Sequence, residues 1–226
     1  MSLWEPPDLA GMRVSYDRGE LRRADLHPTP LAQFLAWLGE VTTAPLPEPN
    51  AMILATADAA GEVTARTVLL KAADARGFSW FTNYTSRKAQ ALAEHPRASL
   101  VFPWFALHRQ VTAIGAVERL PADETAAYFR SRPRGSQLAA WASRQSTPIG
   151  GRAELDERLA ALERRWPEGT AVPVPDFWGG YLLRPTSVEF WHGRVSRMHD
   201  RLRYEAVGSR GPLDKPGDWR VQRYSP

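Results

Sequence analysis

The segment ARTVLLKAADARGFSWFTNYTSRK, residues 65–88, decides the fold that we expect for this chain. Its β-branched and apolar residues predict a strand over Val63–Lys71 and a returning strand over Phe78–Phe81. Gly77 closes the turn between the two strands. Ser86 is a suitable N-cap for a helix that we expect to run to Glu94. The segment therefore predicts a strand, a turn, a second strand and a helix.

Cations lie wherever the backbone of this segment changes direction. Arg66 and Lys71 flank the first strand, and Arg87 and Lys88 open the helix, whose unpaired N–H groups and dipole favour an anion. The chain has 29 lysines and arginines, of which only three are lysine. Lysine kept in an arginine-rich chain indicates a specific geometric demand. Lysines that merely solvate a strand end and a helix face fit the pattern equally well.

The composition is that of a globular protein with an excess of positive charge. Hydrophobic residues make up 43% and charged residues 24% of the 226 residues, and the formal net charge is +4. This charge favours anionic partners, among which a phosphorylated metabolite serves as well as a nucleic acid. Cysteine is absent, which excludes disulfides and a cysteine nucleophile and suits the cytoplasm, where we expect the protein to act. No signal-like N-terminus and no apolar run of about 18 residues occur, so we expect no export and no membrane partner.

The chain divides into an arm and one domain. Residues 1–28 are rich in proline and charge, so we expect a flexible N-terminal arm that becomes ordered only by docking. Residues 29–226 are expected to form a single domain, with helices over 30–44, 86–94, 123–131, 136–141 and 155–166 and strands over 52–56, 63–71, 78–81, 98–104, 109–120, 178–183, 187–192, 201–207 and 219–224. Because these strands are short and mostly joined by hairpins, the expected fold class is α+β, mainly antiparallel β, with the strands forming a barrel.

A second group of polar residues surrounds a predicted break between two helices. Pro133 disfavours helical geometry at Arg132, and Ser136 is able to cap a new helix. Since a chain reversal brings a helix end and a helix start together, Tyr128, Arg132 and Ser136 would converge there. A solvated connector that happens to contain these residue types is an equally good explanation.

A third group lies near the C-terminus. Residues two apart in an extended chain face the same side, so Arg197, His199 and Arg201 would line one surface. A lone histidine is most often a structural group, but one flanked by guanidinium groups on both sides suits a site for an anion or an aromatic ring.

Several kinds of chemistry find no support in the sequence. The five histidines show no metal-ligand spacing, and there is no Walker loop, no GxGxxG after a strand and no GxSxG motif. We therefore expect no metal site, and neither P-loop chemistry nor serine hydrolysis.

Ten colinear motifs together make the chain recognisable. They are EPNAM (48–52), RTVLLK (66–71), FTNYTSRK (81–88), FPW (102–104), RQV (109–111), SRPRGSQLAAWAS (131–143), RQS (144–146), FWGGY (177–181), EFWHGR (189–194) and RMHDR (197–201). In this order and over nearly the whole chain, the sequence resembles the pyridoxine/pyridoxamine 5'-phosphate oxidase family.

The resemblance implies a fold, a cofactor and a reaction. The fold would be a split β-barrel with surrounding helices, in a homodimer that binds FMN at the subunit interface. The reaction would oxidise pyridoxine 5'-phosphate and pyridoxamine 5'-phosphate to pyridoxal 5'-phosphate in vitamin B6 salvage and biosynthesis. A hydride would pass from C4' to flavin N5, and O2 would then take the electrons to give H2O2, with NH3 released from the amine.

The resemblance also implies roles for individual residues. The residues implied to bind FMN, with Arg66 and Lys88 near its phosphate, are Arg66, Thr67, Val68, Leu69, Lys71, Phe81, Thr82, Arg87, Lys88, Gln110, Gln145, Ser146, Trp191 and Arg201. Those implied to bind the substrate are Arg13, Tyr16, Lys71, Tyr128, Arg132, Ser136, Arg197 and His199. Of these, Arg197 and His199 would contact the pyridine ring as the catalytic pair, and Arg13 and Tyr16 match a segment that closes over the active site.

Two departures and two rival functions accompany this interpretation. His192 stands where the family pattern suggests glutamine, and residues 205–218 form a Gly- and Pro-containing excursion. One rival is another split-barrel flavin enzyme, a phenazine-type oxidase or a deazaflavin-dependent reductase, which would have no reason to keep both substrate-binding groups. The other is a basic RNA-binding module, for which no RNP or KH signature is present, so we expect no nucleic-acid partner.

Overall fold

The structure is a computed structural model that describes residues 8–12, 14–17, 19–208 and 211–226. Its strands form one sheet in which all neighbours are antiparallel, and five α-helices surround that sheet. The strands are β1 (Ala51–Ala57), β2 (Val63–Leu69), β3 (Ala72–Asp74), β4 (Gly77–Asn83), β5 (Arg97–Trp104), β6 (Arg109–Arg119), β7 (Trp178–His192), β8 (Asp200–Ala206) and β9 (Trp219–Tyr224). The helices are α1 (Pro30–Thr43), α2 (Arg87–Glu94), α3 (Ala122–Ser131), α4 (Arg134–Ala142) and α5 (Arg152–Arg165). The predicted α+β class with a mainly antiparallel sheet is confirmed.

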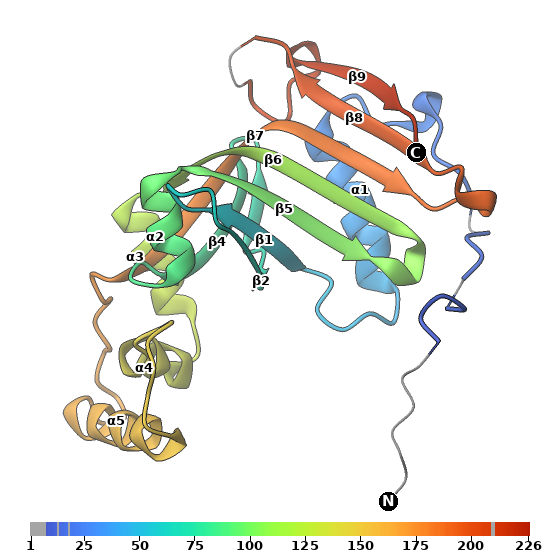
Figure 1. Cartoon of the computed structure of the whole chain (residues 1–226). Helices are drawn as coiled ribbons and strands as arrows, with labels where there is room; N and C mark the ends of the chain where they lie inside the picture. Colours follow the sequence, from blue (N-terminus) through green and yellow to red (C-terminus); the bar gives the residue numbers. More distant parts are fainter. Residues whose placement is uncertain (1–7, 13, 18, 209–210) are drawn as a thin grey trace, which may run out of the picture.

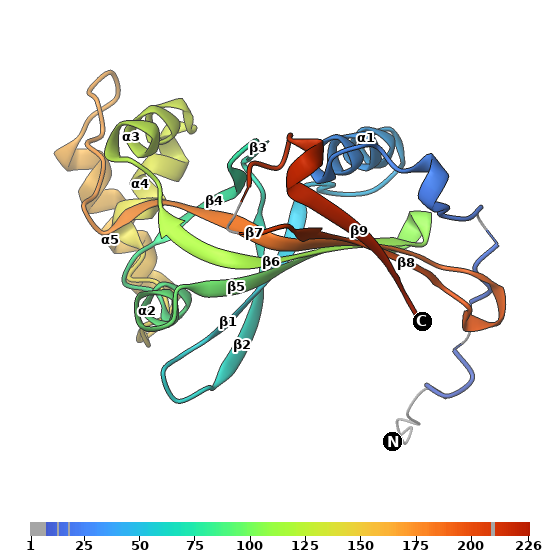
Figure 2. The same cartoon turned by 90° about the horizontal axis from the view of Figure 1, so that it is seen from above.

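The sheet is curled rather than flat (Figures 1 and 2). Its strand order is β2-β1-β5-β6-β7-β4-β3, and β8 and β9 extend it from β7. Figure 1 shows α2 to α5 gathered at one end of the sheet, whereas β8, β9 and the described residues that precede α1 lie at the other end. The two ends carry different candidate residues, as described below.

The segment that predicts the fold is divided between the two edges of this sheet. We expected residues 63–71 and 78–81 to pair as a hairpin, but β2 pairs with β1, and β4 pairs with the short β3 and with β7. The chain passes from one edge of the sheet to the other between Leu70 and Lys71. The Leu70 N–H donates to Asn50 O (2.9 Å), which precedes β1, whereas the Lys71 N–H donates to Ser79 O (2.8 Å) on β4.

Strand β7 is longer than predicted. The strands expected over 178–183 and 187–192 are one continuous strand, because β6 pairs with both halves. Ile114 pairs with Ser187 and Gly115 pairs with Pro185, so Thr186 is an extra residue at a β-bulge. Gly115 permits this close approach, since a Cβ there would lie 2.0 Å from the Arg184 carbonyl oxygen.

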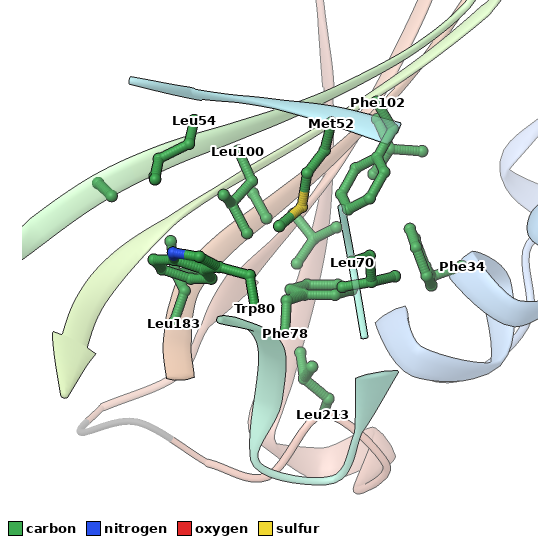
Figure 3. Packing of buried hydrophobic residues seen from close by; sticks show 14 of the residues in the cluster. Phe34, Met52, Leu54, Leu70, Phe78, Trp80, Leu100, Phe102, Leu183 and Leu213 are labelled. Carbon is green, nitrogen blue, oxygen red and sulfur yellow. The ribbon is translucent and has the colours of Figure 1, made fainter. Parts of the chain in front are cut away.

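The core lies between α1 and the inner face of the sheet (Figure 3). Thr29 caps α1, with its Oγ1 accepting the Ala32 N–H (3.2 Å), and Pro30 occupies the first turn. The helix then presents Phe34, which is fully buried and lies edge-on to Phe78 at 4.8 Å and to Phe102 at 4.9 Å. Figure 3 shows these rings beside Met52 and Trp80. Such aromatic burial fixes α1 against the barrel.

A smaller apolar cluster joins α3, α4 and α5 around Phe129, Leu138 and Trp178. Helix α2 begins directly after Ser86, as predicted, but the Ser86 Oγ donates to Asn83 O (2.7 Å) instead of capping the helix. The start predicted for another helix, at Ser136, was wrong. This helix begins at Arg134, before Ser136, because Pro133 supplies the fixed φ that suits the residue preceding a helix.

The arm was predicted to dock, and its described residues from position 20 onward contact the sheet. Leu21 is buried, its N–H donates to Asp200 Oδ2 (3.0 Å), and Tyr204 donates its hydroxyl to His27 O (2.6 Å). The boundary at residue 28 and the single domain over 29–226 stay predictions. Among the residues that the structure describes, no helix combines the length and the apolar character needed to cross a bilayer.

Candidate functional site

A pocket of about 1050 Å³ opens between β2, β4, α2 and the α3–α4 connection. Its volume lies at the upper end of the range for small-molecule pockets, roughly 300 to 1000 Å³. Eleven of the fourteen predicted cofactor residues line it, namely Arg66, Thr67, Val68, Leu69, Lys71, Phe81, Thr82, Arg87, Lys88, Gln145 and Ser146. Tyr128, Arg132 and Ser136 line it as well. The structure thus brings together two groups that lie far apart in the sequence.

Arg66 is held in a fixed position on one wall. Its Nη1 donates to Leu54 O (3.0 Å) and Thr56 Oγ1 (2.9 Å), and its Nη2 donates to Thr64 Oγ1. Burial, with a further contribution from Arg87, lowers the pKa of Arg66 from its ordinary value. All three acceptors are neutral, so the guanidinium charge is uncompensated by its hydrogen-bond partners.

Lys88 is a buried ammonium group in the first turn of α2. Its side chain is 7% exposed, and its Nζ donates to Thr82 Oγ1 (3.1 Å), Gln145 Oε1 (3.1 Å) and Ser86 Oγ (3.4 Å). Burial and then the Arg66 charge lower the pKa of Lys88 to about 8. A buried cation with only neutral partners is costly, and an anion bound beside Lys88 and Arg66 would offset that cost.

The opposite wall contains an unsatisfied cation. The Nη1 atom of Arg132 is buried and has no hydrogen-bond partner among the described residues. Its guanidinium group lies over the Trp178 ring, 4.7 Å from the centroid, and burial lowers the pKa of Arg132. Tyr128 stacks on Phe81 with ring centroids 3.9 Å apart. Because buried polar atoms are rarely left unpaired, Arg132 marks a second anion position in the same pocket.

The linker after α4 is fastened to the pocket at three places. Asn83 Nδ2 donates to Ser143 O (3.3 Å), Thr82 Oγ1 donates to Gln145 Oε1 (3.2 Å), and the Arg87 N–H donates to Ser146 Oγ (3.3 Å). Sequence reasoning missed Asn83 as a pocket residue, although its place in the polar turn before α2 was a signal for it.

Six predicted residues described by the structure do not line the pocket. They are Tyr16, Gln110, Trp191, Arg197, His199 and Arg201. Trp191 pairs in register with Gln110 on β6 and with Arg201 on β8, and its ring lies 4.7 Å from that of His199. Counted along β7, Trp191 lies about 40 Å from Trp178 at the pocket. We call this group the distal cluster. Arg13 lies outside the described residues.

Only part of the distal cluster has the extended backbone that we predicted. Arg197 closes the turn Val195–Arg197, and both Ser196 (φ 55°) and Arg197 (φ 61°) have left-handed backbone conformations. Such conformations in residues other than glycine are strained, and they are enriched at functional sites. The extended chain begins at Asp200.

His199 has a defined tautomer. Its Nδ1 accepts the Arg194 N–H (3.1 Å), so a neutral ring carries its proton on Nε2. Partial burial, followed by the nearby Arg197 charge, lowers the pKa of His199 and favours this neutral form. His199 is therefore suited to donate a hydrogen bond through Nε2.

Sequence reasoning also missed Glu189, a buried carboxylate behind the distal cluster. Arg201 donates from Nε to Glu189 Oε1 (3.0 Å) and from Nη2 to Oε2 (3.1 Å), and Arg203 adds a bond to Oε2 (2.7 Å). Burial acts to raise the pKa of Glu189, but these hydrogen bonds lower it overall. The period of two that places Glu189 and Trp191 on one face was a signal for it.

Comparison with solved structures identifies the fold. PhzG from Burkholderia lata, in complex with tetrahydrophenazine-1-carboxylic acid, has a TM-score of 0.81 at 30% identity over 90% of this chain and 95% of that one. A pyridoxamine 5'-phosphate oxidase-related, FMN binding protein from Nostoc punctiforme has the same fold, with a TM-score of 0.68 at 14% identity over 87% of this chain and 98% of that one. Together with the cation-lined pocket, these comparisons define the class: an FMN-binding split-barrel flavoprotein.

Comparison with sequences narrows the class to a family. Residues 38–163 match the model of pyridoxamine 5'-phosphate oxidase, and residues 178–226 match that of the pyridoxine 5'-phosphate oxidase C-terminal dimerisation region. Proteins named pyridoxine/pyridoxamine 5'-phosphate oxidase are similar over 97% of this chain, at 55% identity in Frankia alni (90% of that protein) and 53% in Thermobifida fusca (98% of that protein). The chain belongs to the pyridoxine/pyridoxamine 5'-phosphate oxidase family, which confirms the resemblance drawn from its motifs.

Proposed function

We propose that this protein is an enzyme that uses FMN to oxidise pyridoxine 5'-phosphate and pyridoxamine 5'-phosphate to pyridoxal 5'-phosphate. The observation that carries the proposal is a single pocket with two separate cation groups, one around Lys88 and one around Arg132. Such a pair of cation groups suits a cofactor and a substrate that each carry one phosphate group. A dianion needs several charge-assisted hydrogen bonds, each worth roughly 1.5–3 kcal/mol net, and both groups offer them.

Each cation group takes one phosphate. Arg66, Arg87 and Lys88 would hold the phosphate of FMN. Lys71, Tyr128, Arg132 and Ser136 would hold the phosphate of the substrate. When bound, FMN supplies the ring that accepts a hydride equivalent from the substrate C4' and passes the electrons to O2. The protein contributes placement, because the remote phosphate orients the reacting carbon.

The distal cluster would complete the site of the partner subunit in a homodimer. Residues 178–226 match a dimerisation region and contain Trp191, Arg197, His199 and Arg201. In one chain these residues lie about 40 Å along β7 from the pocket, too far to share a ligand with it. A second copy would bring its distal cluster to the pocket, so that FMN lies at the interface. Arg197 and the Nε2–H of His199 would then contact the pyridine ring.

The rival functions are less well supported. PhzG is 30% identical, whereas the relatives named as pyridoxine/pyridoxamine 5'-phosphate oxidases reach 53–55%. A phenazine or a deazaflavin substrate also gives no reason for a second phosphate-binding group around Arg132. An RNA-binding surface would expose its cations, yet Lys88 is buried. The cytoplasmic location stays a prediction.

Oxygen consumption tests the proposal directly. The FMN-loaded protein is given pyridoxine 5'-phosphate or unphosphorylated pyridoxine. We expect kcat/KM to be at least about 100-fold higher with the phosphate, because two lost charge-assisted hydrogen bonds correspond to that factor. Equal rates with both substrates would refute the assignment of a substrate phosphate site. A protein that cannot be loaded with FMN would contradict the whole proposal.

A further inference from the structure

One carboxylate fastens the N-terminal arm to the sheet. Asp200, the first residue of β8, accepts the Leu21 N–H at Oδ2 (3.0 Å) and an Nη1 hydrogen of Arg223 at Oδ1. Arg223 also donates from Nη2 to Leu21 O (3.0 Å), so Asp200 and Arg223 together bind both backbone polar groups of Leu21. The Leu21 side chain is 5% exposed and belongs to the main core. The arm is thus clamped at this residue.

The same carboxylate is connected to the loop that carries His199. Arg194 Nη1 donates to Glu20 Oε2 (2.8 Å) on the arm and to Asp200 Oδ2 (3.4 Å). The backbone N–H of Arg194 is the group that donates to His199 Nδ1. Asp200 therefore contacts Arg194, whose backbone N–H sets the tautomer of His199. Glu20 on the arm contacts the same Arg194 side chain.

The clamp at Leu21 lies five residues after Tyr16, whose ring contacts other residues of the distal cluster. The Tyr16 ring lies edge-on to His108 at 4.7 Å, to His199 at 5.6 Å and to Trp191 at 5.9 Å. It also covers the backbone of Gly193, where an added Cβ would lie 2.8 Å from the ring. The position of Tyr16 on this cluster thus depends on where the arm is held.

We propose that Asp200 is a positioning residue with two roles. It holds the arm at Leu21, so that the Tyr16 ring stays in contact with the His199 ring. It also fixes the position of the Arg194 loop, whose backbone N–H orients the His199 ring. Its carboxylate reaches the site through Leu21, Arg194 and Arg223. The effect on the reaction rests on the proposed function, whereas the docking of the arm does not.

Hydrogen exchange of the full-length, FMN-loaded protein tests the docking. In Asp200→Ala we expect the Leu21 amide to exchange at least about tenfold faster, the factor for one lost hydrogen bond to a charged group, while core amides of β7 stay protected. Arg223→Met removes the other half of the clamp and is expected to release Leu21 as well. Asp214→Asn removes an exposed charge from the connection between β8 and β9, at the other end of this hairpin from the clamp, and serves as the control. Unchanged protection of Leu21 in Asp200→Ala and in Arg223→Met would overturn the proposal.

Kinetics with pyridoxine 5'-phosphate test the positioning role. We expect Asp200→Ala to raise KM about tenfold with unchanged FMN content, and the isosteric Asp200→Asn, which keeps one acceptor oxygen, to raise it less. In a Tyr16→Ala background the same change at Asp200 should have a smaller effect on KM than in the wild type, because the route through the arm is already lost and only the route through Arg194 remains. Additive effects would overturn the proposal. A wild-type protein without oxidase activity would refute the proposed function alone, since the exchange experiment still decides the docking.

Discussion

At the scale of single residues, Lys88 carries a charge that its surroundings do not balance. Its hydrogen-bond partners are two hydroxyls and an amide oxygen. Because an FMN phosphate would be its missing counter-charge, we expect Lys88→Ala to raise the Kd of FMN about 10- to 100-fold, the range for one charge-assisted bond. Quenching of FMN fluorescence measures this affinity. The control is Lys215→Ala at an exposed lysine. Equal weakening in both variants would contradict the assignment.

The depressed pKa of Lys88 also predicts how stability depends on pH. The folded pKa of about 8 lies below the ordinary value of 10.5, so the unfolded chain binds more protons between these values. The free energy of unfolding of the FMN-free protein should therefore rise with pH across that window, by at most about 3 kcal/mol from this group. Urea denaturation at several pH values, compared with Lys88→Met, isolates the contribution. The same pH slope in both proteins would refute it.

Most residues that line the pocket could be predicted because short motifs carry them, whereas their roles in binding stay predictions. Arg66, Lys71, Arg87 and Lys88, the cations that the sequence pattern singled out, all line the pocket. The buried partners were missed. Glu189 and Asn83 act through atoms that belong to other elements, and no local pattern of charge reveals such contacts.

At the scale of elements, the predictions succeeded where side-chain period and turn residues agree within a few positions. The strands expected over 52–56 and 63–71 form as β1 and β2 and are joined by a turn at Asp58–Gly61, with Gly61 at φ +80°. They failed where a distant strand decides the outcome. The hairpin expected between 63–71 and 78–81 does not form, because β1 and β7 are the partners of β2 and β4. No property of the segment itself specifies those partners.

The bulge between β6 and β7 gives a prediction at this scale. Gly115 has no room for a side chain, because a Cβ would lie 2.0 Å from a backbone oxygen that the sheet holds in place. We expect Gly115→Ala to lower the free energy of unfolding by about 1–3 kcal/mol, the usual cost of overpacking. Urea denaturation measures this difference.

Gly135→Ala is the matched control for that substitution. Gly135 lies in α4, and an added Cβ would meet nothing within 4 Å. Since alanine favours a helix over glycine by roughly 0.5–1 kcal/mol, the control should be neutral or stabilising. A Gly115→Ala variant as stable as the control would show that the two strands separate easily at this point.

At the scale of the whole molecule, the pocket is lined by residues of α2 and α4, whereas the distal cluster surrounds the turn from β7 to β8. Figure 2 shows these elements at opposite ends of the sheet. The motifs indicated which residues belong to the site, but nothing in one sequence tells which copy of the chain supplies each of them. This is why a single list of predicted residues maps onto two places in the structure.

Coexpression of two inactive variants tests the shared site. Arg132→Met is expected to disable the pocket, and Arg197→Met to lower turnover without changing FMN content. In a homodimer with shared sites, random pairing leaves one intact site in each mixed dimer, so about one quarter of the wild-type activity should return. Activity no higher than the mean of the separate variants would show that each chain builds its site alone. Coexpression of each variant with itself is the control.

The extra residue Thr186 has a consequence for the phase of β7. Side chains on a strand alternate between faces, and a single additional residue exchanges the odd and even positions that follow it. Residues from Ser187 to His192 are therefore out of step with Trp178 to Pro185. Deleting Thr186 would leave Pro185 opposite Gly115 and Ser187 opposite Ile114, so Glu189 and Trp191 would keep their partners on β6 and their face of the sheet, and only the bulge would be lost. The bulge thus absorbs one residue of β7 without altering which face the distal half of the strand presents.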